Sequence, residues 1–590
     1  MTSNNHQIDH KFDVAILGTG IGGTILGTIL ARQGIKVLLL EQGCHPRFTI
    51  GESTIPETTI LLRLMAKRYS VPEVASLSNF QRVRANISSS CGVKRNFSFA
   101  YHRYGEPHAA HETTQFPTWA PPYGPDVHYF RQDVDAYMLA TAISYGATAR
   151  QQTKVQEVSI DSTGVRLCTD KGEESKAQFV VDAGGIQAPI AQMLNLRESP
   201  CPLKTRSRSI FTHMINVLPY DHCGPNPKEH RMPSPFSQGT LHHLFKGGWM
   251  WVIPFDNHPT STNALCSVGV NLDLNEYPRT DITPEQEFWE IVGRFPSIAK
   301  QFEKARPARN WIGTDRLQFS SKQVVGERFC LLPHAASFVD PLFSSGLAIT
   351  MSTINVLANR LIRATRENDF SVERFQYIDT WVKKSFEYYD QLVSCSYIAF
   401  SDFELWNAWH RVWMLGGLYG VSALFEVLSR FESIGDPSAF DRSEQYPYRG
   451  VQALDLEEYA QLLSATAQEV EAVRDQKQSA SEAALRIYSL LGSSGLCPTP
   501  WGLSSSEKRC PGTFTLVPML RLIAWGRYRS PDIIRKHYFL TGRASGLVSD
   551  IQKNILDEFG RLSQTSFGLL RDSLFSWNRD WTRNHINGQH

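Results

Sequence analysis

Three glycines near the N-terminus have the spacing that binds the diphosphate of a dinucleotide. They lie in the segment GTGIGG, which follows the apolar run 12–17 and precedes a helical pattern. Gly18 permits a tight turn, Gly20 lets the backbone approach the diphosphate, and Gly23 lets the helix pack closely. A second apolar run ends in Glu41, whose carboxylate can accept hydrogen bonds from a ribose. The sequence therefore predicts a bound dinucleotide.

Two later segments indicate that this dinucleotide is FAD. Arg131 begins a helical pattern at 130–145 with an acidic first turn, and the segment VVDAGG is a strand pattern that ends in Asp182 and Gly184. Both resemble flavin-contacting segments of the aromatic hydroxylase superfamily. An ordinary amphipathic helix with a surface arginine is the alternative interpretation of the first. We find no second glycine fingerprint, so one dinucleotide is expected.

A tryptophan pair lies in the segment GWMWVIP at 248–254. The period-two spacing of Trp249, Trp251 and Ile253 predicts a strand with both indoles on one face. Pro254 lacks an N–H and is expected to end the strand or place it at an edge. Taken alone, a core tryptophan pair is the simplest interpretation.

The same segment matches the Trp-x-Trp-x-Ile-Pro motif of flavin-dependent halogenases. In that family the indoles and the following Ile-Pro separate the flavin from the substrate. The segment GESTIP, with Glu52, Ser53 and Ile55, resembles the family's strap beside the isoalloxazine ring. The segment CGVKRNFSF resembles the strand of the catalytic lysine, a role that the resemblance gives to Lys94.

The resemblance continues in the segment VDPLFSSG at 339–346. This segment is similar to the family's late flavin loop, so Asp340 and Pro341 are expected beside the cofactor. The amides of Ser345 and Gly346 are expected to hold the halide. The matches run in the family's order over residues 10–400, and the likeness is closest to its pyrrole-halogenating branch.

Two positions depart from the patterns of related enzymes. His334 follows Pro333 where the superfamily commonly has Gly-Asp, with the aspartate on the ribityl chain of the flavin; the pyrrole-halogenating branch shares a histidine there, so His334 is expected near FAD. Phe343 occupies the place of a glutamate that faces the reactive centre of tryptophan halogenases. A general base at that position is excluded, which argues against free tryptophan as substrate.

The resemblance implies an enzyme that uses reduced FAD, O2 and chloride or bromide to make hypohalous acid. Lys94 would hold this acid by a hydrogen bond, or react with it, beside an electron-rich pyrrole or phenol in natural product biosynthesis. The small aromatic substrate can be free, peptide-bound or carrier-bound, and a separate flavin reductase is the expected partner. An aromatic hydroxylase on the same fold and a non-catalytic flavin-binding scaffold are the alternatives.

The composition of the chain excludes several other classes. Its 590 residues carry a net charge of +2 without a block of like charges, which argues against nucleic acid and membrane partners. Ten cysteines without a Cys-x-x-Cys pair argue against a metal site and against a secreted disulfide scaffold. The polar N-terminus indicates a cytoplasmic protein. A monomer or a homodimer is expected.

The predicted fold is α/β (α+β), with a Rossmann-like FAD domain, an inserted mixed or antiparallel substrate sheet and a helical C-terminal domain. The FAD domain is expected at 1–110 and 111–200, with a return and the halide loop at 321–370. The substrate sheet is expected at 201–320 and the helical cap at 371–590.

Helical patterns fill most of the C-terminal third. They cover 350–366, 370–389, 401–419, 454–473, 518–529 and 551–571, with loops at 477–480 and 491–506. Aromatic residues at helical spacing in 401–419 indicate core packing or a cap over the substrate. Asp402, Glu404 and His410 are candidates for a substrate base by chemical type only.

Overall fold

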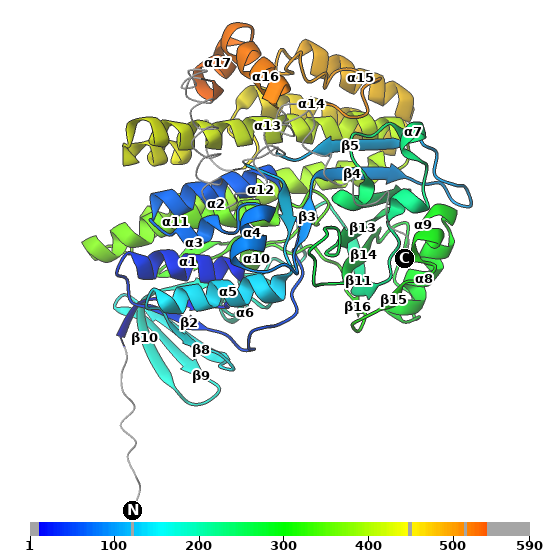
Figure 1. Cartoon of the computed structure of the whole chain (residues 1–590). Helices are drawn as coiled ribbons and strands as arrows, with labels where there is room; N and C mark the ends of the chain where they lie inside the picture. Colours follow the sequence, from blue (N-terminus) through cyan, green and yellow to red (C-terminus); the bar gives the residue numbers. More distant parts are fainter. Residues whose placement is uncertain (1–10, 120–122, 446–450, 513–515, 540–590) are drawn as a thin grey trace, which may run out of the picture.

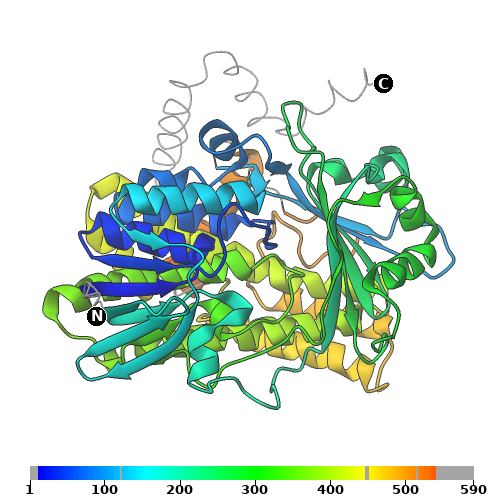
Figure 2. The same ribbon diagram turned by 90° about the horizontal axis from the view of Figure 1, so that it is seen from below.

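The computed structural model describes residues 11–119, 123–445, 451–512 and 516–539. The helix expected at 551–571 lies outside these ranges. In the described residues two large sheets stand side by side, and long helices run across both (Figures 1 and 2).

The first sheet forms where apolar runs in the sequence predict buried parallel strands. In the described residues its order is β17-β18-β10-β1-β2-β7, with β9 pairing β10 and β8 pairing β9. Neighbours from β18 to β7 are parallel, while β9, β8 and β17 are added antiparallel. Its strands are β1 (Lys11–Leu17), β2 (Val37–Leu40), β7 (Thr148–Arg150), β8 (Val155–Asp161), β9 (Gly164–Thr169), β10 (Glu174–Asp182), β17 (Val325–Gly326) and β18 (Phe329–Leu331).

The second sheet is mixed and runs in the order β15-β11-β14-β13-β12-β4-β5, with β16 on β11, in the described residues. β4 pairs parallel with β12, so residues 96–117 join a sheet that is otherwise built from residues after 206. Its strands are β4 (Asn96–Tyr101), β5 (Thr113–Pro117), β11 (Ser207–Ile215), β12 (Thr240–Phe245), β13 (Gly248–Pro254), β14 (Cys266–Asp273), β15 (Arg306–Pro307) and β16 (Ile312–Gly313). The division into domains stays a prediction.

Helices cover the first sheet as the glycine fingerprint requires. The helices of this part are α1 (Ile21–Arg32), α2 (Pro56–Arg68), α3 (Pro72–Ala75), α4 (Phe80–Asn86), α5 (Arg131–Ser144), α6 (Pro189–Met193), α10 (Pro333–Ala336) and α11 (Gly346–Glu367). Helices α1 and α5 pack together, as do α1 and α11. The strand–loop–helix that the sequence predicts at residues 12–33 is confirmed.

Three further helices belong to the region of the second sheet or its loops: α7 (Pro227–His230), α8 (Pro284–Gly293) and α9 (Pro296–Phe302). Along β13 the side chains alternate between two cores. Met250 and Val252 pack in the core that contains residues of α8 and α9, while Trp249, Trp251 and Ile253 join the main core. The prediction that both indoles share one face is confirmed, and Pro254 is the last residue of the strand.

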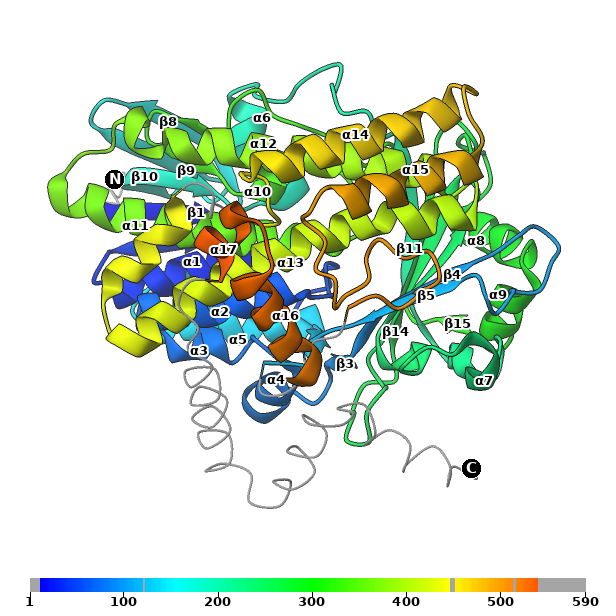
Figure 3. The same cartoon turned by 90° about the horizontal axis from the view of Figure 1, so that it is seen from above.

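Six C-terminal helices occur in the described residues. Those at 372–399 and 403–434 are longer than the sequence patterns predict, and those at 480–493 and 532–538 were not predicted. The six helices are α12 (Val372–Ala399), α13 (Phe403–Ile434), α14 (Glu457–Arg474), α15 (Ala480–Ser493), α16 (Leu516–Tyr528) and α17 (Asp532–Tyr538). Figure 3 shows α13 crossing the molecule from the first sheet's helices to β4 and β5. The segment Phe403–Glu432 is long and apolar enough to cross a membrane, but 78% of its most apolar window is buried inside the protein.

Candidate active site

Lys94 is the last residue of β3 (Gly92–Lys94), a short strand between the two sheets, and it is fully buried. Its Nζ donates hydrogen bonds to Ser53 Oγ at 2.8 Å and to Thr54 O at 2.7 Å. The same nitrogen lies 4.1 Å from the centroid of the Phe97 ring. Two N–H positions are thus held by the strap of residues 51–56, and the amine sits against an aromatic face.

Local pairing explains why the strap lies beside Lys94. β3 pairs antiparallel with β6 (Asp126–His128), and Ser53 forms a bridge with His128 on the other side of β6. Thr54 N donates to Val127 O at 3.3 Å, and Tyr129 N donates to Glu52 O at 2.7 Å. The strap is therefore bridged to β6, and its Ser53 and Thr54 oxygens lie within hydrogen-bond reach of Lys94.

Asp126 is the charged neighbour of the lysine. It lies opposite Lys94 in the β3–β6 register and is fully buried. Burial lowers the pKa of Lys94 far below its ordinary value, and the negative charge of Asp126 opposes that shift. Burial raises the pKa of Asp126, and the Lys94 charge and a hydrogen bond from Thr59 oppose it. The lysine can therefore lose its proton much more readily than an exposed lysine.

A chain of hydrogen bonds continues from Ser53 behind Lys94. His128 Nδ1 lies 3.1 Å from Pro254 O, which can only accept, so Nδ1 carries the ring proton. Burial lowers the pKa of His128 to about 3, so its ring is neutral and Nε2 accepts from Thr240 Oγ1 at 2.9 Å. Thr240 then accepts from Ser53 at 2.9 Å, which leaves Ser53 Oγ as the acceptor for Lys94. Every proton in this chain has one position.

Glu52 joins the strap to the tryptophan strand. Its carboxylate accepts from His213 Nε2 at 2.8 Å and from Ser267 Oγ at 2.9 Å. Trp251 Nε1 in turn donates to Ser267 Oγ at 3.2 Å. The indole of Trp251 is therefore fixed through Ser267 to the strap, and Trp249 lies beside it with ring centroids 5.8 Å apart.

Near the indoles, aromatic rings from the second sheet, the late loop and α13 pack together. This aromatic cluster consists of Phe97, Phe99, Phe116, His242, Phe343, Trp406, His410 and Trp413. Trp249 borders it through His242, at 5.3 Å between centroids. Lys94 borders it through Phe97. A lysine of lowered pKa thus meets a set of rings suited to a flat ligand.

The glycine loop forms a cradle for a diphosphate at the start of α1. Gly18 has φ of +104°, and a Cβ there would lie 2.6 Å from Ala183 O; a Cβ on Gly23 would lie 2.1 Å from Gly18 O. Gly20 caps the helix, and the nearest atoms to a Cβ on Gly20 belong to Arg47, Arg131 and Asp135. Arg47 and the Arg131–Asp135 ion pair thus lie beside a helix N-terminus whose free amides suit a diphosphate.

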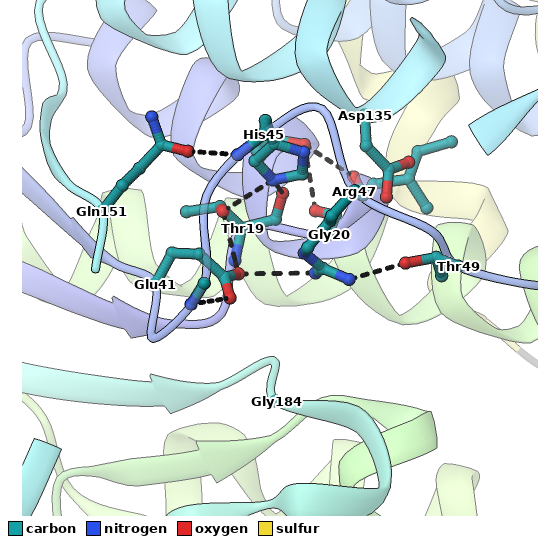
Figure 4. A network of polar contacts seen from close by, with 12 residues as sticks. Thr19, Gly20, Glu41, His45, Arg47, Thr49, Asp135, Gln151 and Gly184 are labelled. Atoms are coloured by element: carbon teal, nitrogen blue, oxygen red, sulfur yellow. Dashed lines mark hydrogen bonds and ion pairs between the residues drawn. The ribbon is translucent and has the colours of Figure 1, made fainter. Parts of the chain in front are cut away.

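Figure 4 shows Glu41 beside this loop, as expected for the ribose-binding acid. Its carboxylate accepts from Thr19 N and Thr19 Oγ1, both at 3.0 Å, and from Gly43 N at 2.9 Å. Burial raises the pKa of Glu41, but these hydrogen bonds and the charge of Arg47 outweigh it, so the net pKa is lowered. Glu41 is therefore ionised and placed to accept from hydroxyl groups.

The late loop lies at the N-terminus of α11. Ser345 caps this helix and Gly346 is its first residue, so their amides point out of the helix end. A Cβ on Gly346 would lie 2.5 Å from His334 Nε2, because the imidazole packs directly against the glycine. Burial and the charge of Arg131 lower the pKa of His334 to about 4. A neutral ring therefore lies between the arginine of the cradle and the expected halide amides.

Comparison with known proteins identifies the family. The family model described as tryptophan halogenase matches residues 106–443. The chain is 45% identical to monodechloroaminopyrrolnitrin halogenase PrnC of Pseudomonas fluorescens, over 91% of this chain and 95% of that protein. It is 43% identical to tetracycline 7-halogenase of Kitasatospora aureofaciens, over 89% and 94% of the two chains. The chain belongs to the flavin-dependent halogenases.

A solved structure supports the same family and its cofactor. The crystal structure of halogenase PltM in complex with phloroglucinol and FAD is 38% identical, has a TM-score of 0.82, and matches 85% of this chain and 99% of that one. This protein is thus an FAD-dependent halogenase that uses halide. The comparisons favour this interpretation over that of an aromatic hydroxylase. FAD fits the groups present: the glycine cradle, the two arginines and Glu41. Among the described residues there is no group of three or more His, Cys, Asp or Glu that could hold a metal ion.

Two predicted cofactor contacts of the halogenase are engaged by the protein itself. Asp182 accepts from Gly184 N at 2.9 Å and from Ile190 N at 2.8 Å, so it shapes the turn that faces Gly18. Asp340 accepts from Ser207 Oγ at 2.9 Å and Tyr397 OH at 3.0 Å. Burial raises the pKa of each carboxyl to about 6. Their contact with flavin stays a prediction, as does that of Ile55 and Pro341.

Sequence reasoning missed the partners of Lys94. Asp126 and His128 were not singled out, although the spacing Asp-x-His in a short strand places both on one side. Their position opposite Lys94 depends on the pairing of β3 with β6, which a single sequence does not reveal. Of the three suggested substrate bases, Asp402 caps α13 and Glu404 is exposed, while His410 lies in the aromatic cluster.

The structure also contains a cavity of about 400 Å³ away from these residues. Arg63, Lys67, Arg82, Tyr123 and Glu432 are among its lining side chains. No residue of the predicted site lines it, so the candidate site rests on the Lys94 contacts and the cradle.

Proposed function

We propose that Lys94 delivers the oxidised halide to the substrate carbon in this halogenase. The observation that carries the proposal is the setting of Nζ: two protons are donated to Ser53 and Thr54, and the nitrogen lies against Phe97 at the border of the aromatic cluster. Reduced FAD with O2 supplies the oxidation of the halide. The amides of Ser345 and Gly346 hold that anion at the start of α11.

Burial of the lysine supports the delivery role. The lowered pKa gives a neutral amine near physiological pH, with a lone pair that can attack the halogen of hypohalous acid. The nitrogen–halogen bond forms as the halogen–oxygen bond breaks, and the hydroxide leaves as water with a proton from the amine. The fixed chain from His128 to Ser53 keeps the lysine in one orientation. In this proposal Trp249, Trp251, Ile253 and Pro254 keep the substrate ring away from the flavin. The contacts in support are those of Trp251 to the strap through Ser267 and of Trp249 to the aromatic cluster through His242.

The substrate in this proposal is a small electron-rich aromatic of the phenol or pyrrole type. Such rings react with an oxidised halogen without a strong base, and Phe343 stands where tryptophan halogenases have a glutamate. The structure of PltM was solved in complex with phloroglucinol, and PrnC is named as a monodechloroaminopyrrolnitrin halogenase. Reduced FAD comes from a separate reductase, since the sequence has one glycine fingerprint.

The test supplies the purified chain with FAD, NADH, a flavin reductase, O2 and a panel of phenols and pyrroles. With chloride, mass spectrometry should detect chlorinated products in the wild type; without the reductase, NADH should not be consumed. The matched variants are Lys94→Met, which removes the amine, and Lys384→Met, a half-exposed lysine on α12 paired with Asp455. Chlorination in Lys94→Met at the wild-type rate would overturn the delivery role.

A further inference from the structure

One acceptor in the aromatic cluster has no hydrogen-bond partner in the described part of the chain. His410 is fully buried on α13, and its Nδ1 lies 2.9 Å from Trp406 O, so Nδ1 carries the proton. Among the described residues, Nε2 makes no hydrogen bond. Buried polar atoms are nearly always paired in folded proteins, so such an atom in this aromatic cluster points to a missing partner.

The missing partner must be a donor. Burial and the charge of Arg411 lower the pKa of His410 to about 3, so the ring is neutral near physiological pH and Nε2 presents a lone pair. Nε2 is on the ring edge away from its own helix backbone, because Nδ1 faces the carbonyl of the preceding turn. An O–H or N–H group is therefore the group that would satisfy it.

The neighbours of His410 are aromatic rings, which suit contact with a flat ligand. The imidazole stacks on Phe116 at 5.6 Å and on Trp406 at 5.3 Å. Phe116 is parallel to Phe97, whose ring carries Lys94 Nζ on its face. The histidine and the lysine thus border the same pair of phenylalanines.

Two donors without partners lie on the same face of α13. Trp406 Nε1 and Trp413 Nε1 are buried and make no hydrogen bond in the described part of the chain. Residues 406, 410 and 413 are spaced to share one helix face. The face therefore offers one acceptor between two donors, within a ring cluster.

We propose that His410 Nε2 accepts a hydrogen bond from the ring O–H or N–H of the aromatic substrate and so orients the carbon to be halogenated. This inference deepens the proposed function and rests on it. His410 acts as an acceptor, which distinguishes it from a base that removes a proton. A hydroxyarene or pyrrole satisfies it, while the O-methyl or N-methyl derivative of the same ring cannot.

The test measures equilibrium binding to the FAD-loaded enzyme by calorimetry, without reductant. The probes are phloroglucinol with 1,3,5-trimethoxybenzene, and 3-phenylpyrrole with its N-methyl derivative. The wild type should bind the better of the two N–H or O–H probes about 10- to 100-fold more tightly than its methylated partner. Equal affinity within both pairs would overturn the proposal, and this arm needs no variant.

The variant arm separates His410 from a merely structural residue. In His410→Phe that preference for the free O–H or N–H should disappear, and His410→Gln, which offers a carbonyl acceptor, should restore most of it. An unchanged preference in His410→Phe would overturn the proposal. The binding assay needs no turnover, so it tests His410 separately from Lys94. If His410→Phe loses the preference while Lys94→Met still chlorinates at the wild-type rate, only the role of the lysine is refuted.

Discussion

At the residue scale, the site depends on one amine whose protonation is set by burial. Lys94 has Asp126 as its charged neighbour, while Ser53 and Thr54 accept from it. The role of Lys94 could be predicted, because the segment CGVKRNFSF resembles the halogenase strand that carries the catalytic lysine. The pairing that supplies Asp126, His128 and Thr240 joins segments far apart in sequence, so residue types alone could not reveal it.

The charge of Asp126 leads to a prediction about pH. Asp126 raises the pKa of Lys94, so Asp126→Asn should lower it further. If the amine is the reactive form, single-turnover chlorination rises with pH through the pKa of Lys94, and the variant should move this rise to lower pH by roughly one unit. Rapid-quench measurement of product from pH 5 to 9 checks it.

Asp273→Asn is the control, because Asp273 is also a carboxyl of raised pKa but is not among the groups that shift the pKa of Lys94. Its profile should coincide with that of the wild type. A rise at the same pH in Asp126→Asn, or a rate that falls as pH increases, would contradict the role of the neutral amine.

At the element scale, the strap, β13 and the start of α11 place the groups that meet at the site. The alternation of β13 and the helix after the late loop followed directly from sequence periodicity and motif. The contribution of β4 and β5 to the second sheet did not, because parallel pairing with β12 is a long-range contact. The lengths of α12 and α13 were underestimated, since their apolar stripes continue beyond the expected ends.

The contact between α10 and α11 gives a prediction for the halide. Gly346→Ala would place a Cβ against His334 Nε2, so the imidazole or the helix start must shift. If the amides at 345 and 346 hold chloride, the chloride KM should rise about tenfold while FAD remains bound. The chloride dependence of chlorination at saturating substrate measures it.

The double variant His334→Ala/Gly346→Ala is the control, because removal of the imidazole makes room for the added methyl group. Its chloride KM should lie below that of Gly346→Ala. A Gly346→Ala enzyme with the wild-type chloride KM would show that this helix start does not bind the halide.

At the scale of the whole molecule, α13 connects the helices beside the first sheet with the second sheet. It packs on α2, and its aromatic residues contact β4 and β5. The fold class could be predicted because the glycine fingerprint and the halogenase motifs occur in order. How the C-terminal helices lie over both sheets could not, because their apolar faces fit more than one partner.

Glu57 reports on the contact between α2 and the segment after α13. It is buried and accepts from Gln452 Nε2 at 2.7 Å, and burial raises its pKa to about 8. Between these two pKa values, Glu57 is protonated in the folded chain and ionised in the unfolded chain, where its pKa is 4.5. The stability from this group is present below pH 4.5 and is lost as pH rises through 8.

Glu57→Gln keeps a carbonyl acceptor and removes the titration. We expect its thermal midpoint relative to the wild type to rise by about 2–4 °C between pH 5 and pH 8.5. Glu482→Gln, at an exposed position in the first turn of α15, should give no such trend. Parallel pH dependences for the wild type and Glu57→Gln would contradict a buried protonated Glu57.

The most direct test of the account compares the chlorinated product formed per flavin oxidised by the wild type and by Lys94→Met, both loaded with FAD. The account predicts that Lys94→Met binds FAD normally and that its yield of chlorinated aromatic falls at least about a thousandfold. A yield within about tenfold of the wild type would contradict delivery of the halogen by Lys94.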